Sequence, residues 1–192
     1  MVFVLLVLAG LAVWVAVAYN GLVALKNQVA NAWKQIDVQL KRRHDLIPNL
    51  VNAVRGAMQF ERETLENVVN ARNRAIGAQS SGSVAQTAAA EAQLGQALGR
   101  LLAVVEAYPD LKATSNIRAL QEEIASTENK LAFSRQFYND VATQYNTRQQ
   151  QFPTNLVAGL AKASPVGLWE VEDAEARAVP QVDLAPNPPP RF

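Results

Sequence analysis

Apolar residues after residue 28 recur at alternating intervals of three and four, which is the period of one face of an α-helix. The stripe is narrow, closer to the seam of a coiled coil than to the broad face of a surface helix. It predicts one long helix over about residues 26–76, ending at "IGAQSSGSV", where Gly77 and Gly82 bracket a small polar loop. The seam positions are Val29, Trp33, Ile36, Leu40, Arg43, Ile47, Leu50, Val54, Ala57, Glu61, Leu65, Val68, Arg72 and Ala75.

Pro48 lies inside this seam and has no backbone N–H, so it either begins a new helix or kinks an existing one. If Asp45 capped a new helix, Pro48 would fall in the first turn, where backbone donors are unpaired anyway. A joint between helices would usually reset the phase of the apolar pattern, but the phase holds from Ile36 to Val54. We therefore expect a continuous helix with a kink at Asp45 and Pro48, where the carbonyl of His44 loses its donor.

Three further helical segments are predicted, at about residues 84–108, 115–152 and 154–162, with Pro109 and Pro153 ending the first two. The stretch "AQTAAAEAQLGQALG" is rich in small residues, which let a neighbouring helix approach closely. Strand signals are nearly absent, and residues 164–192 turn acidic and then proline-rich, which is typical of an extended tail. The sequence predicts an all-α protein, an antiparallel three- or four-helix bundle with coiled-coil-like packing over residues 26–163.

Residues 1–25 carry no charged side chain. A helix of this length spans roughly 37 Å at 1.5 Å per residue, enough to cross about 30 Å of hydrocarbon. The alternative is a cleaved signal peptide, since "AVA" at 16–18 resembles a cleavage site. No basic residue precedes the run, however, and the run is long for a signal peptide. We predict a transmembrane anchor over residues 1–25 that is continuous with the first bundle helix.

Basic residues follow the apolar run, at Lys26, Lys34 and the triplet Lys41, Arg42 and Arg43. The positive-inside rule places such residues on the cytoplasmic side. We expect a single-pass protein of the cell inner membrane with its N-terminus outside and its bundle in the cytoplasm.

The composition of the chain removes several classes of function. Its net charge of +1 gives no global electrostatic reason to bind nucleic acid, and the absence of cysteine removes disulfides, thiol chemistry and cysteine zinc sites. The basic triplet lies roughly 25 Å beyond Leu25, outside the Debye length from a flat membrane. The tail motif "PNPPPR" has the spacing of a polyproline ligand, a weak signal. We expect no nucleic acid, metal or cofactor.

His44 is the only histidine, and its neighbour Asp45 suggests a general base. Adjacent residues on a helix project about 100° apart and do not face each other. No second histidine or cysteine completes a dyad, although a serine brought close by the fold stays open. We interpret His44 as an ordinary surface histidine and expect no catalytic residue.

Charged residues interrupt the apolar seam at Arg43, Glu61 and Arg72. A charge removed from water costs several kcal/mol unless it is paired, so these residues predict partners on other helices. Glu128 and Arg135 in the segment 115–152 are the candidates. The alternative is that Arg43, Glu61 and Arg72 lie at the margin of the seam and stay partly solvated. Two Tyr-Asn dipeptides one heptad apart, at 138–139 and 145–146, predict packing with a hydrogen-bonded hydroxyl.

Several of these motifs together resemble the LemA family. They are "YNGLVALKNQV", "AWKQIDVQLKRRHDLIPNLV", "FERETL", "NVVNAR", "ENKLAFSRQFYNDVATQYN" and "FPTNLVA", in that order up to about Leu160. The resemblance implies a short N-terminus outside the cytoplasm, one membrane helix and a soluble helical bundle. It also implies membrane organisation, since relatives in magnetosome-forming bacteria are associated with membrane invagination.

Two functions from different classes follow. The first is a non-enzymatic, membrane-anchored helical scaffold that self-associates and organises or shapes the membrane, with lipid and further copies of itself as partners. The second is an adaptor that presents its bundle or tail to another membrane protein, such as a protease or transporter. An enzyme is the third and least supported class.

Overall fold

The computed structural model describes residues 1–56, 61–109, 111 and 114–170. Within these ranges the regular secondary structure is entirely helical. The prediction of an all-helical chain is therefore confirmed for the described residues. The helices are α1 (Val2–Arg55), α2 (Arg62–Ser80), α3 (Val84–Glu106), α5 (Ser115–Gln150) and α6 (Asn155–Ala158).

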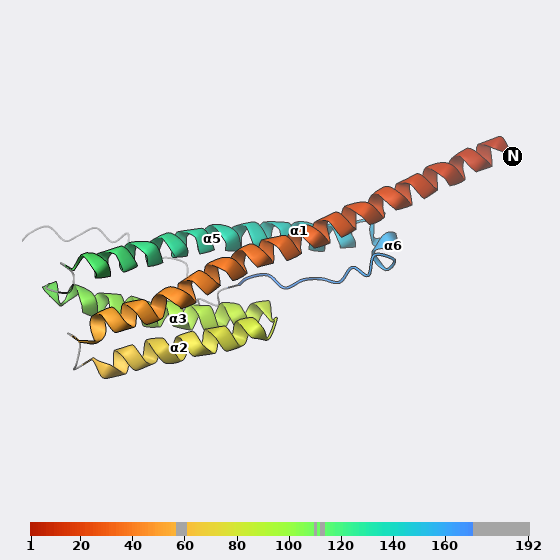
Figure 1. The fold of residues 1–192 in the computed structure, drawn as a ribbon. Helices are drawn as coiled ribbons and strands as arrows, with labels where there is room; N and C mark the ends of the chain where they lie inside the picture. The colour runs from red at the N-terminus through yellow and green to blue at the C-terminus, as the bar shows by residue number, and fades with distance from the viewer. Residues whose placement is uncertain (57–60, 110, 112–113, 171–192) are drawn as a thin grey trace, which may run out of the picture.

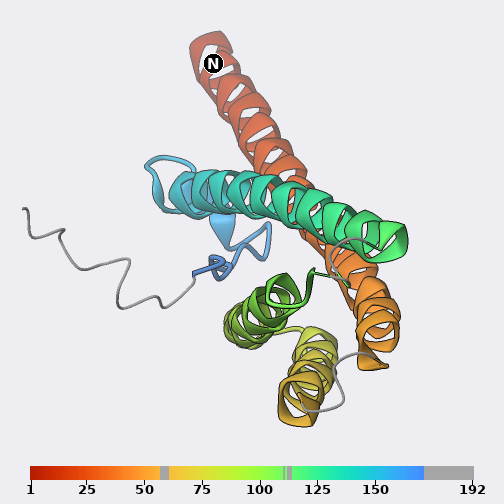
Figure 2. The same ribbon diagram turned by 90° about the vertical axis from the view of Figure 1, so that its left-hand side faces the viewer.

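The four long helices run alternately up and down as an antiparallel bundle (Figure 1). α1 packs chiefly against α5, and α2 chiefly against α3, with α1 also touching α2. Viewed end-on, the α2–α3 hairpin lies across the α1–α5 pair as a second layer (Figure 2). The far N-terminal part of α1 extends out of the bundle as an arm (Figure 1).

The predicted single helix over residues 26–76 is wrong, because α1 ends at Arg55 and α2 begins at Arg62 and runs back alongside it. Seam position Ala57 lies outside the described residues. Burial explains why the chain reverses. Leu65, Val68, Ala71 and Ala75 form the buried face of α2, and a straight rod would have left them in water.

Pro48 lies inside α1, which continues through it as the unbroken apolar phase predicted. Asp45 therefore does not cap a new helix. The buried positions of α1 follow the predicted seam from Val29 to Val54, with Trp33 half-buried. The kink predicted at Asp45 and Pro48 stays a prediction.

The remaining helix boundaries differ from the predictions by a few residues. α2 runs through Gly77 to Ser80, and the turn into α3 uses Gly82 at a φ of 73°, a conformation that glycine adopts without strain. Ser83 then caps α3 by accepting a hydrogen bond from the amide of Gln86. α6 is shorter than the predicted 154–162, with turns rather than helix after Ala158.

The core consists of two hydrophobic clusters that follow one another along the bundle axis. The cluster farther from the arm joins α1 from Ile47 onward to α2, α3 and the first part of α5. The cluster nearer the arm joins α1 from Val29 to Leu40 to the last part of α5 and to Trp169. Arg43 and His44 fall between the two clusters, so polar residues occupy the middle of the bundle.

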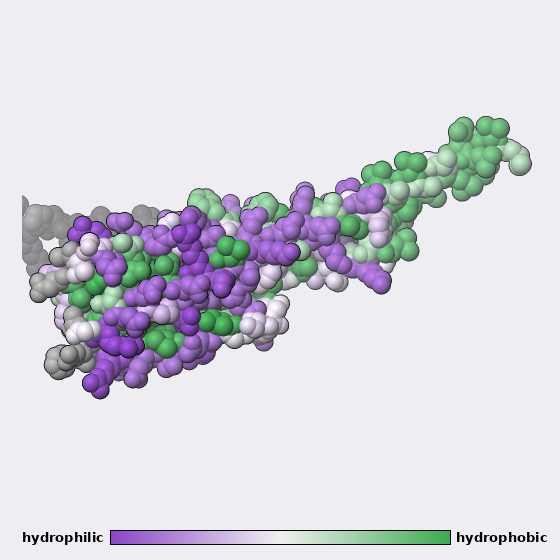
Figure 3. All heavy atoms as spheres, viewed as in Figure 1, coloured by the Kyte–Doolittle hydropathy of each residue, from purple (hydrophilic) through white to green (hydrophobic). Residues whose placement is uncertain are grey.

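The arm is apolar and uncovered by protein. Residues 1–13 are all exposed, and the first buried residue of the described chain is Ala18. Figure 3 shows the arm as a hydrophobic projection from the bundle. α1 is the one helix in the described ranges that is long and apolar enough to cross a membrane, judged by length and composition, and 6% of its most apolar window is buried.

Candidate functional site

The polar residues between the two hydrophobic clusters form a buried charge cluster, here Arg43, His44, Arg72, Glu91, Glu128 and Arg135. Its centre is Glu91 of α3, which is only 1% exposed. Arg43 Nη1 donates to one carboxylate oxygen of Glu91 at 2.8 Å, and His44 Nε2 donates to the other at 2.6 Å. One carboxylate thus binds two consecutive side chains of α1 and fixes the register of α3 against it.

Gly95 makes room for this contact. It lies one turn after Glu91, and a Cβ built on Gly95 would lie 3.3 Å from Arg43 Nη2. Any larger residue would press on the guanidinium. Glycine costs a helix about 1 kcal/mol in propensity relative to alanine. Packing against Arg43 explains why Gly95 nevertheless occurs in this alanine-rich helix.

Arg43 also reaches α5, where its Nε lies 2.6 Å from Glu128 Oε1. Neither atom has an aligned hydrogen-bond partner, so this contact is a close ion pair rather than a directed hydrogen bond. Arg135 follows two turns later on α5. Burial, and then the positive charge of Arg43, lower the pKa of Arg135, while Glu128 and Glu91 oppose the shift.

Arg72 of α2 completes the cluster through a backbone contact. Its Nε donates to the carbonyl of His44 at 2.7 Å. That carbonyl is the acceptor that Pro48, four residues later, cannot serve, because proline has no N–H. Arg72 thus replaces the missing helical donor, which lets α1 continue through Pro48 without an unpaired buried carbonyl.

The predicted site residues are brought together in part. Arg43, Arg72, Glu128 and Arg135 belong to the buried charge cluster. Glu61 does not belong to it, because it lies half-buried at the start of α2, where it accepts a hydrogen bond from Thr64 at 3.5 Å. Asp45 is exposed and lies 3.9 Å from Lys41 on the surface of α1.

Two cluster members were missed from the sequence. The interpretation of His44 as a surface residue is wrong, since it is 3% exposed and faces Glu91. Glu91 lies one heptad before Leu98 on the stripe of α3, and this spacing was the available signal. The His44–Glu91 pair is buried from solvent, which suits structural pairing better than attack on a substrate.

The beginning of the predicted tail, residues 164–170, is docked on the bundle. The Asn139 side chain donates a hydrogen bond to the carbonyl of Trp169 and accepts one from its backbone amide. The Asn146 side chain makes the same two hydrogen bonds with the carbonyl and amide of Val166. The geometry matches, because seven helical residues rise roughly 10 Å and three extended residues span about the same. The repeated Tyr-Asn dipeptide therefore serves to bind an extended segment of the chain.

Aromatic and cationic contacts secure the docked segment. The Trp169 side chain is buried, with its ring centroid 6.0 Å from that of Trp33. The Arg135 guanidinium lies over the Trp169 ring, 4.8 Å from its centroid. The Tyr138 hydroxyl donates to the carbonyl of Gly167 at 2.8 Å, as expected of a packed tyrosine, and burial raises its pKa. Residues 171–192, including the "PNPPPR" motif, lie outside the described residues.

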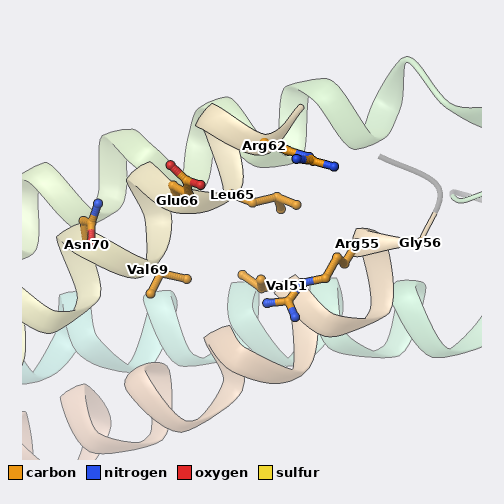
Figure 4. Close-up of a pocket in the computed structure, with 8 residues that line it drawn as sticks. All are labelled: Val51, Arg55, Gly56, Arg62, Leu65, Glu66, Val69 and Asn70. Atoms are coloured by element: carbon orange, nitrogen blue, oxygen red, sulfur yellow. The ribbon is translucent and has the colours of Figure 1, made fainter. Parts of the chain in front are cut away.

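A pocket of about 940 Å³ opens at the end of the bundle away from the arm, between α1 and α2 (Figure 4). Val51, Leu65 and Val69 supply apolar walls, while Arg55 and Arg62 supply two cations and Glu66 supplies one carboxylate. The described residues contain no group of histidine, cysteine, aspartate or glutamate arranged to hold a metal ion.

Comparison with known proteins adds the following. The model of the LemA family matches residues 32–184. Protein LemA of Metamycoplasma hominis is 29% identical over 167 residues, covering 86% of this chain and 72% of that protein. Magnetosome protein MamQ 2 of Paramagnetospirillum magneticum is 24% identical and MamQ of Magnetospirillum gryphiswaldense 22% identical, each over 73% of this chain. The chain spans 60% of the length of these two magnetosome proteins.

Proposed function

Because the chain belongs to the LemA family, we propose that it is a non-enzymatic helical scaffold, anchored by one transmembrane helix, that self-associates and organises the membrane. The observation that carries this proposal is the uncovered apolar arm of α1, which continues without interruption into the bundle. A bundle built directly on its anchor has little freedom to swing, which suits a spacer or scaffold. The similarity to proteins named as magnetosome proteins supports a role at membranes.

Self-association has a candidate surface on α5. Phe133 and Phe137 are 74% and 46% exposed, and a spacing of four places them on one face of the helix. Phenylalanine is enriched at protein interfaces relative to the rest of the surface. We propose that this α5 face, defined by Phe133 and Phe137, contacts a second copy of the chain.

The orientation proposed for the anchor follows from charge. Lys26, Lys34 and the triplet Lys41 to Arg43 lie after the apolar arm, so the bundle faces the cytoplasm at the inner membrane. Because the chain has no cysteine, a single introduced cysteine reports its own location. A cysteine at Val38, which is exposed on α1, should react with a membrane-impermeant maleimide only after the cell is opened. Reaction in intact cells, or release of the protein by alkaline carbonate, would contradict the anchor or its orientation.

An adaptor for another membrane protein is the second candidate. The pocket between α1 and α2 favours it, because an apolar wall beside two arginines suits a peptide with acidic and apolar side chains (Figure 4). Two variants distinguish the adaptor from the scaffold. One lacks residues 171–192, and the other has glutamine in place of both Arg55 and Arg62. A scaffold keeps its assembly in both variants, whereas an adaptor loses its partner in a pull-down with one of them.

A further inference from the structure

The turn around α6, residues 151–162, lies at the end of the bundle where the arm leaves (Figure 1), and it carries exposed apolar side chains. Phe152, Leu156 and Leu160 are 80%, 68% and 70% exposed. No charged residue occurs from Gln149 to Ala161, whereas Arg148 and Lys162 flank the stretch. We call residues 151–162 the α6 turn.

The α6 turn is held in place rather than free. α6 packs against both α1 and α5, and Val157 is only 2% exposed. Backbone hydrogen bonds from Ala158 to Thr154 and from Ala161 to Val157 continue the helical path, so Leu156 and Leu160 project from one side. The turn therefore presents an apolar face while its other side is anchored in the bundle.

The apolar run of α1 overlaps the end of the bundle. The run continues without a charged side chain to Leu25, while from Ala18 onward one face of α1 is covered by the bundle. The charged residue that follows the run is Lys26, so the boundary of the hydrocarbon lies near Leu25, beside the bundle end. Placing the whole uncharged run in the membrane therefore brings the bundle end to the boundary of the bilayer.

We propose that the α6 turn is a lipid-binding surface that inserts into the headgroup and upper acyl region of the bilayer crossed by α1. The proposal rests on the anchor proposed above. From Ala18 to Leu25 the uncharged run rises roughly 10 Å alongside the bundle. This agrees with the ~5–10 Å depth at which amphipathic helices lie in a membrane. Hydrophobic atoms on the arm and beside its base at the bundle end are visible in Figure 3. Lipid is the occupant because the arm brings this surface to the bilayer by covalent connection.

Fluorescence quenching on single-cysteine variants of the full chain tests the proposal. Leu160→Cys and Leu156→Cys report on the α6 turn, and Leu8→Cys reports on the arm. Val38→Cys is the matched control, because Val38 is equally apolar and 61% exposed but lies on α1 well past Lys26. Each variant carries an environment-sensitive dye in vesicles of phosphatidylcholine and phosphatidylglycerol, and is challenged with aqueous iodide or with nitroxide-labelled lipids.

We expect the dye at residues 156 and 160 to be quenched by nitroxides near the headgroup, and iodide quenching to fall at least about threefold below that at residue 38. Iodide quenching equal to that at residue 38, with the dye at residue 8 quenched by lipid, would overturn the lipid surface and leave the anchor intact. Shielding from iodide without lipid quenching would also overturn it, and would assign the α6 turn to a contact between copies. A dye at residue 8 that iodide reaches freely would instead overturn the anchor.

Discussion

At the scale of single residues, Glu91 is the side chain on which the middle of the bundle depends. Its carboxylate binds Arg43 and His44 at once, and all three are at most 3% exposed. A buried charge that loses its partner keeps the full cost of leaving water. Stability should therefore respond far more strongly to this position than to surface ion pairs.

Glu91→Gln keeps the shape of the side chain and removes its charge. We expect the free energy of unfolding to fall by about 3 kcal/mol or more, because Arg43 stays buried with its main counter-charge removed. Chemical denaturation in detergent measures the loss. Glu123→Gln is the control, since Glu123 pairs with Arg42 at the surface, where such pairs contribute about 0–1 kcal/mol. Equal losses in the two variants would contradict the assignment.

Arg72 and Pro48 make a second prediction, because Arg72 serves the His44 carbonyl that Pro48 leaves without a helical donor. Arg72→Met should lower the free energy of unfolding by about 1–3 kcal/mol in the native background. In a Pro48→Ala background the alanine N–H can bond that carbonyl, so the same change should cost less than about 1 kcal/mol. A double-mutant cycle that gives additive losses would show that the two residues do not share this acceptor.

From the sequence, the charges at seam positions were expected to meet partners on other helices, with Glu128 and Arg135 as candidates. Arg43 does reach Glu128 on α5, whereas Arg72 reaches a backbone carbonyl of α1. Reasoning from the sequence failed for His44 and Glu91. His44 was interpreted as a surface residue because Asp45 cannot face it and no second histidine or cysteine completes a dyad. A long guanidinium and an imidazole nevertheless converge on one carboxylate, which depends on where α3 lies rather than on the phase of α1.

At the scale of elements, the docked segment 164–170 explains why Tyr-Asn occurs twice on α5. Asn139→Ala and Asn146→Ala each remove two hydrogen bonds to the segment. Hydrogen exchange of the Trp169 amide in the first variant and the Val166 amide in the second should become about tenfold faster or more, because these amides lose their acceptors. Asn116→Ala, at an exposed site on α5, should change neither. Unchanged protection in both variants would contradict the docking.

Docking should also depend on pH through Tyr138. Burial raises its pKa above the ordinary 10.0, so the neutral hydroxyl is the form favoured by the fold. The resulting stabilisation is fully present below pH 10 and is lost as the pH rises through the folded-state pKa. We expect exchange at the docked segment to accelerate in this alkaline range in the native chain. In Tyr138→Phe, which has no ionisable hydroxyl, that acceleration should be absent.

The sequence predicted most of the helices but not the reversal between α1 and α2. The phase of the seam is the same on both sides of the loop, since Val54 and Leu65 fit one pattern of threes and fours. Periodicity therefore could not distinguish a rod from a hairpin, and Gly56 was the weak local signal. Pro48 was the candidate site of a break in the helix. Arg72 instead supplies the hydrogen bond that Pro48 cannot donate to the His44 carbonyl, and periodicity alone does not show this contact.

At the scale of the whole molecule, the proposed anchor and the bundle share one helix. α1 runs from Val2 to Arg55, so the apolar arm joins the bundle without an intervening loop. The proposed lipid contact at the α6 turn and the proposed contact between copies at the α5 face lie on different parts of the bundle. A scaffold needs both kinds of surface, one for the bilayer and one for its neighbours.

Single-molecule photobleaching in native membrane vesicles counts the copies in each assembly and so tests the proposed self-association. With the full chain at low expression, we expect assemblies of two or more copies that persist on dilution. Phe133→Glu with Phe137→Glu should shift the population to single copies, because two charges would be buried at the α5 face. Val38→Glu, on an exposed site of α1, is the control and should leave the assemblies unchanged. Single copies of the native chain across the whole range of expression would rule out self-association.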